Sequence, residues 1–309
     1  MSSAEKIAAI FPGQGAQSVG MLSELAANHA SIKLRFAEAS DVVGFDLWAM
    51  TEQGPSEVLG QTENTQPALL TASVALWDLW PGAHEKVAMM AGHSLGEYSA
   101  LVCAGAMSFA DGVALVRKRG ELMQAAVPNG QGTMAAVLGL DDEAIAQCCD
   151  QVAGEVSAAN YNAPGQVVIA GETDAVHAAI DACKAAGAKR AVPLDVSGPF
   201  HSRLMERAAN DFSEALSAIE LTLPEIPVYQ NVHGQVADSV DEMRRLLVEQ
   251  LYSPVRWTTC VSALLGAGVA QFVECGPGNV LAGLVKRISR GTPTVGLSTA
   301  DGIEAAQAL

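Results

Sequence analysis

The segment Gly92-His-Ser-Leu-Gly96 has the residue types of a nucleophilic serine on a sharp turn. An apolar strand is predicted over 87–91 and an apolar helix over 95–104, so this turn joins a strand to a helix. The two glycines let neighbouring backbone pass without a Cβ clash, and a helix N-terminus directs amide N–H groups at developing negative charge. Ser94 is therefore the candidate nucleophile, and the Leu95 amide is one candidate donor to an oxyanion.

A serine hydroxyl needs a base, and the chain has six histidines. His201 and His233 both follow predicted strands, so either ring is able to face the turn that holds Ser94. Residue chemistry alone leaves both candidates open. We favour His201 because it lies at the seam between two predicted domains, where pockets form.

A second glycine-rich segment, Gly13-Gln-Gly15, follows a first strand predicted over 7–11. It does not fit a dinucleotide-binding loop, because Ser18 stands where the third glycine belongs. No acidic residue ends a second strand at the usual distance either. We expect this tight loop to present a backbone N–H toward Ser94 instead.

Strand-length apolar runs alternate with helix-length segments, which predicts an α/β fold with a mostly parallel sheet covered by helices. The stretch from about 130 to 195 differs, because it predicts β-α-β-β-α-β order, a split βαβ unit that can stand as a module. We therefore predict a large domain, residues 1–127 and 198–309, that carries an inserted small domain, residues 128–197. Further predicted elements are helices over 66–80, 109–126, 202–219 and 241–251 and strands over 226–229 and 271–275.

The composition is typical of a globular enzyme in a reducing compartment. Hydrophobic residues make up 50% of the 309 positions and charged residues 17%. The net charge of −16 and the lack of a Lys and Arg stripe argue against a nucleic-acid partner. The six cysteines show no metal-ligand spacing, which predicts buried free thiols. With no signal-peptide pattern and no membrane-length apolar run, we predict a cytoplasmic protein without a membrane partner.

Five motifs occur in order: Gly13-Gln-Gly-Ala-Gln17, Gly92-His-Ser-Leu-Gly-Glu97, Arg119-Gly120, Gly198-Pro-Phe-His-Ser202 and Gln250-Leu-Tyr-Ser-Pro-Val255. Together they closely resemble the malonyl-CoA:acyl carrier protein transacylases of bacterial fatty acid synthesis. The resemblance covers essentially the whole chain and is far more specific than the serine turn alone. It implies a hydrolase-like large domain with a ferredoxin-like insertion, in agreement with the predicted elements.

The resemblance also implies roles for the matching residues. Ser94 would be the nucleophile and His201 the general base and acid, which settles the choice between the two histidines. The backbone N–H groups of Gln14 and Leu95 would form the oxyanion hole. The main-chain carbonyl of Gln250 would orient the histidine in place of a triad aspartate.

The implied substrate contacts involve two more residues. Arg119 would bind the free carboxylate of the malonyl group, because a planar guanidinium pairs with a carboxylate through two hydrogen bonds. Phe200 would crowd a branched α-carbon, although a methyl group is worth only ~1–3 kcal/mol in a pocket, so selection against methylmalonyl would be partial. The implied substrate is malonyl-CoA, the implied partner is acyl carrier protein, and family members work as monomers without metal or cofactor.

Acyl carrier proteins are acidic, so docking on this acidic chain requires a local basic surface. The candidate docking residues are Lys184, Lys189, Arg190, Lys286, Arg287 and Arg290. Two other classes of function stay open at this point: a serine esterase on a related fold, and a non-catalytic subunit that binds the carrier protein. Within the family, service to a polyketide synthase would use the same chemistry as fatty acid synthesis.

Overall fold

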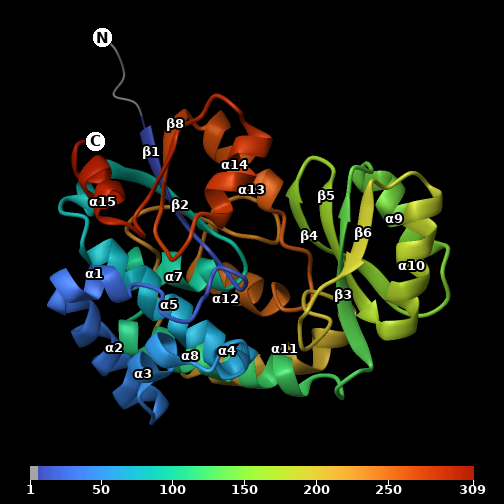
Figure 1. Ribbon diagram of the computed structural model, residues 1–309, viewed down its shortest axis with the longest axis horizontal. Coiled ribbons are helices and arrows are strands. Elements are labelled where there is room, and N and C mark those ends of the chain that lie inside the picture. Colours follow the sequence, from blue (N-terminus) through green and yellow to red (C-terminus); the bar gives the residue numbers. More distant parts are fainter. Residues whose placement is uncertain (1–5) are drawn as a thin grey trace.

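The computed structural model describes residues 6–309 and contains two separate β-sheets (Figure 1). The larger sheet has five strands in the order β7-β2-β1-β8-β9, and every neighbouring pair is parallel. The prediction of an α/β chain with a parallel sheet is thus confirmed. The strands are β1 (Lys6–Phe11), β2 (Val87–Gly92), β7 (Val228–Tyr229), β8 (Val269–Glu274) and β9 (Thr294–Gly296).

The middle strand β1 is apolar beyond its first residue because both of its faces are covered. Side chains alternate along a strand, so Ala8 and Ile10 belong to one apolar cluster while Ala9 and Phe11 belong to another. The first cluster includes α13 (Trp257–Gly266) and α14 (Val280–Ile288). The second includes α5 (Thr62–Asp78), α7 (Leu95–Cys103) and α8 (Phe109–Ala125).

Several elements outside residues 128–197 were not predicted or have bounds that differ from the predicted ones. The helix predicted over 202–219 begins as a 3₁₀ turn, Arg203–Met205, and continues as α11 (Glu206–Ser217). The strand predicted over 226–229 keeps only the two residues of β7. The other helices are α1 (Ser23–Asn28), α2 (Ala30–Val43), α3 (Leu47–Gln53), α4 (Ser56–Leu59), α6 (Ala83–Lys86), α12 (Val240–Glu249) and α15 (Ala300–Gln307).

The smaller sheet lies to the right in Figure 1 and has the order β4-β5-β3-β6, with every pair antiparallel. Its elements follow the predicted β-α-β-β-α-β order, and α9 and α10 pack on one face around an apolar cluster of their own. The elements are β3 (Gly132–Leu138), α9 (Asp142–Asp150), β4 (Val156–Ala163), β5 (Gln166–Glu172), α10 (Thr173–Ala185) and β6 (Arg190–Pro193).

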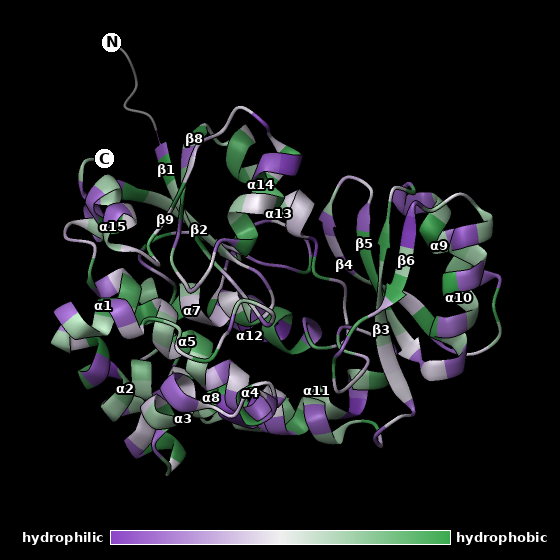
Figure 2. Ribbon diagram, in the orientation of Figure 1, coloured by the Kyte–Doolittle hydropathy of each residue, from purple (hydrophilic) through white to green (hydrophobic). Residues whose placement is uncertain are grey.

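Hydrophobic and hydrophilic bands alternate along the helices that cover both sheets, as Figure 2 shows. Such bands let one side of a helix pack inward while the other side meets water. Across residues 6–309 no helix combines the length and the apolar character needed to cross a membrane.

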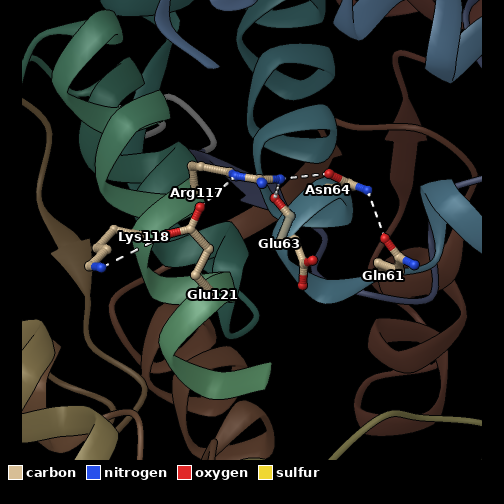
Figure 3. A network of polar contacts seen from close by, with 6 residues as sticks. All are labelled: Gln61, Glu63, Asn64, Arg117, Lys118 and Glu121. Atoms are coloured by element: carbon tan, nitrogen blue, oxygen red, sulfur yellow. Dashed lines mark hydrogen bonds and ion pairs between the residues drawn. The ribbon is translucent and has the colours of Figure 1, made fainter. Parts of the chain in front are cut away.

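Helix α5 begins four residues before the predicted start, at Thr62, and contains a proline. Pro67 has no N–H, so the carbonyl of Glu63 lacks its helical donor. Arg117 on α8 donates from Nη1 to that carbonyl (3.0 Å) and to Asn64 Oδ1 (2.6 Å), and from Nε to Glu121 (3.0 Å), as Figure 3 shows. Arg117 therefore joins α8 to the first turns of α5.

Candidate active site

Ser94 lies between β2 and α7 with a backbone conformation that L-residues rarely adopt (φ 52°, ψ −109°). Tight packing on both sides of the serine explains the flanking glycines. A Cβ on Gly92 would overlap the backbone of Gly96, and a Cβ on Gly96 would overlap the carbonyl of Phe11. The sequence thus forms a strained turn, or elbow, that presents the Ser94 hydroxyl at the carboxyl end of β2.

The structure brings His201, rather than His233, to this hydroxyl. Ser94 Oγ lies 2.7 Å from His201 Nε2, and His201 Nδ1 lies 2.7 Å from the carbonyl oxygen of Gln250. A carbonyl only accepts, so Nδ1 carries the proton and Nε2 presents its lone pair to the serine. His233 is instead an acceptor for the amide of Gln235, two residues along the chain.

Burial is the largest influence on the His201 ring, followed by the positive charge of Arg119, and together they lower the pKa of His201 to about 3. The ring is therefore neutral near pH 7 and is able to accept the serine proton. Phe200, the residue before it, is buried in the apolar cluster of the large sheet.

Arg119 is only 1% exposed, which separates it from the other basic residues of α8, the half-buried Arg117 and the exposed Lys118. Its Nη1 donates to Gln66 Oε1 (2.9 Å), and its Nη2 donates to Gln250 Oε1 (2.9 Å) and to Ser94 Oγ (3.3 Å). Throughout the described part of the chain no carboxylate forms an ion pair with this guanidinium. A buried cation with neutral partners is suited to an anionic ligand group.

Two backbone amides near Ser94, those of Gln14 and Leu95, make no hydrogen bond within the described chain. The loop of Gly13 and Gln14 packs directly on the elbow, since a Cβ on Gly13 would overlap the carbonyl of His93. Among the hydrogen bonds of residues 6–309, none uses the amide of Gln14 or of Leu95 as donor. Both amides are therefore unoccupied within the chain, as an oxyanion hole requires.

Polar residues that we did not predict surround these groups. Asn231 Oδ1 accepts from the Ser94 amide (2.7 Å), and Glu97 Oε2 accepts from the Asn231 amide (2.7 Å). Burial raises the pKa of Glu97 to about 7, although hydrogen bonds from Asn231 and Gln250 oppose the shift. Glu97 was visible as part of the serine motif, whereas Asn231 and Gln66 carried no sequence signal.

A cleft of about 820 Å³ is lined by residues of the predicted large domain, among them Gln14, Gln61 and Gln124, and by residues of the predicted insertion, among them Asp195. A second cavity of about 270 Å³ also includes Gln14 and reaches His93. Across residues 6–309 no group of three or more His, Cys, Asp or Glu side chains is arranged to hold a metal ion. Besides neutral amides and backbone groups, the lining of the larger cleft includes the carboxylates of Glu57 and Asp195.

Comparison with known proteins assigns the chain to a family. Residues 9–302 match the model of the acyl transferase domain. The malonyl CoA-acyl carrier protein transacylase of Salmonella typhimurium is 55% identical over 286 residues, which cover 92% of this chain and 93% of the relative. The transacylase of Bacillus subtilis is 47% identical over 304 residues, 97% of this chain and 96% of the relative. The chain belongs to the malonyl CoA-acyl carrier protein transacylases.

Solved structures of this transacylase family agree with the fold. A malonyl-transacylase in complex with its type II polyketide synthase acyl-carrier protein has a TM-score of 0.95 and 50% identity, covering 98% of this chain and 99% of that one. The transacylase of Coxiella burnetii has a TM-score of 0.96 and 42% identity, covering 98% and 97%. The resemblance found from five sequence motifs is confirmed, and the chain is an acyltransferase enzyme.

Proposed function

We propose that the chain transfers a malonyl group from coenzyme A to the phosphopantetheine thiol of acyl carrier protein, in fatty acid biosynthesis, through an ester on Ser94. The observation that carries the proposal is the position of one atom. Ser94 Oγ lies 2.7 Å from the neutral base His201 and 3.3 Å from Arg119. A hydroxyl between a base and an unpaired buried cation suits an acyl group that carries its own carboxylate.

The first half-reaction loads the serine. As Ser94 Oγ attacks the thioester carbon, its proton passes to His201 Nε2, and the Gln250 carbonyl stabilises the imidazolium through Nδ1. The amides of Gln14 and Leu95 bind the oxyanion of the tetrahedral intermediate. The carbon–sulfur bond then breaks, the proton moves from His201 to the leaving thiolate, and coenzyme A departs.

The second half-reaction repeats these steps in reverse with the carrier-protein thiol as nucleophile. His201 takes the thiol proton, the sulfur attacks the ester carbon, and Ser94 leaves with the proton restored. A thioester is exchanged for a thioester, so the net free-energy change is near zero. The histidine and the amides supply the base and the oxyanion donors, so these steps need no cofactor.

Arg119 and Phe200 give the site its selectivity in this proposal. The malonyl carboxylate replaces neutral partners at the Arg119 guanidinium, where a planar fork offers two parallel donors. The bulk of Phe200 beside His201 disfavours a branched α-carbon, with a partial effect because one methyl group is worth ~1–3 kcal/mol.

We propose the same domain organisation that the sequence predicts. Residues 1–127 and 198–309 form a hydrolase-like large domain, and residues 128–197 form a ferredoxin-like insertion. The separate antiparallel sheet with its own apolar cluster supports this division. We also propose a monomer in the cytoplasm, where the six buried free thiols stay reduced.

A second candidate, service to a polyketide synthase, is favoured by one observation. A relative with 50% identity is a malonyl-transacylase solved with a type II polyketide synthase carrier protein. The same residues would carry both activities, so only the carrier protein differs. Comparing kcat/KM for a fatty acid carrier protein and a polyketide carrier protein distinguishes the two, and a higher value for the polyketide carrier would favour this candidate.

The experiment that tests the site is Arg119→Ala, assayed with malonyl-CoA and with acetyl-CoA. We expect kcat/KM for malonyl transfer to fall about 100- to 1,000-fold, because the variant loses a charge-assisted pair, while acetyl transfer changes far less. Arg117→Ala is the matched control, since Arg117 joins α8 to α5 and makes no contact with Ser94. Equal losses for both acyl groups would contradict the carboxylate role.

A further inference from the structure

The backbone of Ser94 has a conformation that surrounding groups must hold in place. The side chain of Asn231 bridges the two flanks of the elbow. Its Oδ1 accepts from the Ser94 amide (2.7 Å), and its Nδ2 donates to the Gly92 carbonyl (2.7 Å). One primary amide thus closes a hydrogen-bonded ring that spans the backbone from Gly92 through His93 to Ser94.

Asn231 is itself held on its main chain. It is completely buried, its amide donates to Glu97 Oε2 (2.7 Å), and its carbonyl accepts from the Arg256 amide (3.0 Å). An amide side chain offers a donor and an acceptor side by side, whereas a carboxylate at this position would offer two acceptors. The residue type therefore matches the bond pattern of the elbow.

Glu97 connects this support to the rest of the site. Its Oε2 accepts from the Asn231 amide (2.7 Å) and from Gln250 Nε2 (3.1 Å). Gln250 in turn accepts from His201 at its carbonyl and from Arg119 at its side-chain oxygen. The buried Glu97 carboxyl group therefore links the residues that hold Ser94, His201 and Arg119 in place.

We propose that Asn231, held by Glu97, is a positioning residue that keeps Ser94 Oγ facing His201 and leaves the Leu95 amide for the oxyanion. The Ser94 amide already donates to Asn231 Oδ1, so the amide of Leu95, the next along the chain, is the one available to the thioester oxygen. The inference rests on the proposed acyl transfer and assigns no contact between Asn231 and substrate. Its loss should slow acylation of the serine without weakening the binding of malonyl-CoA.

The test is Asn231→Asp in single-turnover acylation by malonyl-CoA, followed by rapid quench and intact-protein mass spectrometry. The substitution keeps the size of the side chain and the acceptor for Ser94, but it replaces the donor to Gly92. We expect the maximal acylation rate to fall about 100-fold, the cost typical of a small misplacement of reacting groups. The half-saturating concentration should change less than about 3-fold, because Arg119 stays in place.

Asn64→Asp is the matched control, since Asn64 is another buried asparagine whose Nδ2 donates to a backbone carbonyl, that of Val58 (2.9 Å). It should acylate at the wild-type rate. If Asn231→Asp does not fold, Glu97→Leu tests the same link, with a similar expected loss. Glu97→Gln should restore the rate to within about 5-fold of wild type, because it returns an acceptor for the Asn231 amide.

Three results would overturn the inference. The first is a maximal acylation rate for Asn231→Asp within about 2-fold of wild type, and the second is an equal loss of that rate in Asn64→Asp. The third is a loss of rate in Asn231→Asp that only follows the fraction of unfolded protein in thermal melts. A wild-type protein that forms no malonyl-enzyme would overturn the proposed function as well. Normal acylation by wild type together with normal acylation by Asn231→Asp would reject the positioning role alone.

Discussion

In the proposed mechanism, His201 acts as a base because of where its ring lies rather than because of a partner carboxylate. The carbonyl oxygen of Gln250 at Nδ1 fixes the tautomer and the ring orientation, and its hydrogen bond raises the pKa of His201 by less than burial and Arg119 lower it. Burial and the Arg119 cation act in the opposite direction and keep the ring neutral. In the proposed mechanism the Arg119 cation thus has two effects, since it suits the malonyl carboxylate and also keeps His201 unprotonated.

The pKa of about 3 predicts that His201 stays neutral from pH 8 down to about pH 5. An ordinary histidine with a pKa near 6.5 would be mostly protonated at pH 5. NMR of ¹⁵N-labelled imidazoles measures this directly, with His201→Gln used to assign the signal. In Arg119→Ala the pKa of His201 should rise, because a positive charge has been removed. A midpoint near pH 6.5 in the wild type would contradict this account of the base.

At the scale of elements, the elbow depends on the close approach of β1, β2 and α7. Gly96→Ala would place a Cβ on the Phe11 carbonyl, so we expect ~3 kcal/mol lower stability and loss of acylation. Gly283→Ala in α14 is the matched control, because a Cβ there meets nothing within 4 Å. It should raise stability by ~0.5–1 kcal/mol, the helix preference of alanine over glycine. Urea denaturation measures both, and similar values for the two variants would contradict close packing as the reason for Gly96.

The strand and helix around the elbow were predictable because their apolar pattern is local. The position of Asn231 was not predictable from the sequence. It comes to lie beside the elbow only because β7 pairs in parallel with β2, with Tyr229 opposite Ala91. The predicted start of α5 was wrong because the Glu63 carbonyl, which Pro67 cannot serve as donor, accepts instead from Arg117, 54 residues further along the chain. Such contacts between distant segments leave no periodic signal in the sequence.

The whole molecule carries a net charge of −16, so an acidic partner approaches against overall repulsion. Of the six basic side chains that we predicted for docking, Lys184 pairs with Asp181 (3.8 Å). The other five form no ion pair within the described chain and remain available to a partner. We therefore expect docking to depend on these five rather than on Lys184.

This expectation is tested by the salt dependence of the carrier-protein KM. Raising the ionic strength from about 50 mM to about 300 mM should increase that KM steeply, while the rate of acylation by saturating malonyl-CoA stays nearly constant. Reversing the charge at Lys286 and Arg287 should raise the carrier-protein KM about 10-fold, and Lys184→Glu should have little effect. A KM that is independent of salt would contradict docking by charge.

The central claim is that Ser94 carries the malonyl group, and intact-protein mass spectrometry after brief mixing with malonyl-CoA tests it most directly. We predict a malonyl adduct on the wild-type protein, no adduct on Ser94→Ala, and discharge of the adduct by phosphopantetheinylated carrier protein faster than by water. An adduct that persists in Ser94→Ala, or a wild-type protein that only releases free malonate, would contradict the account.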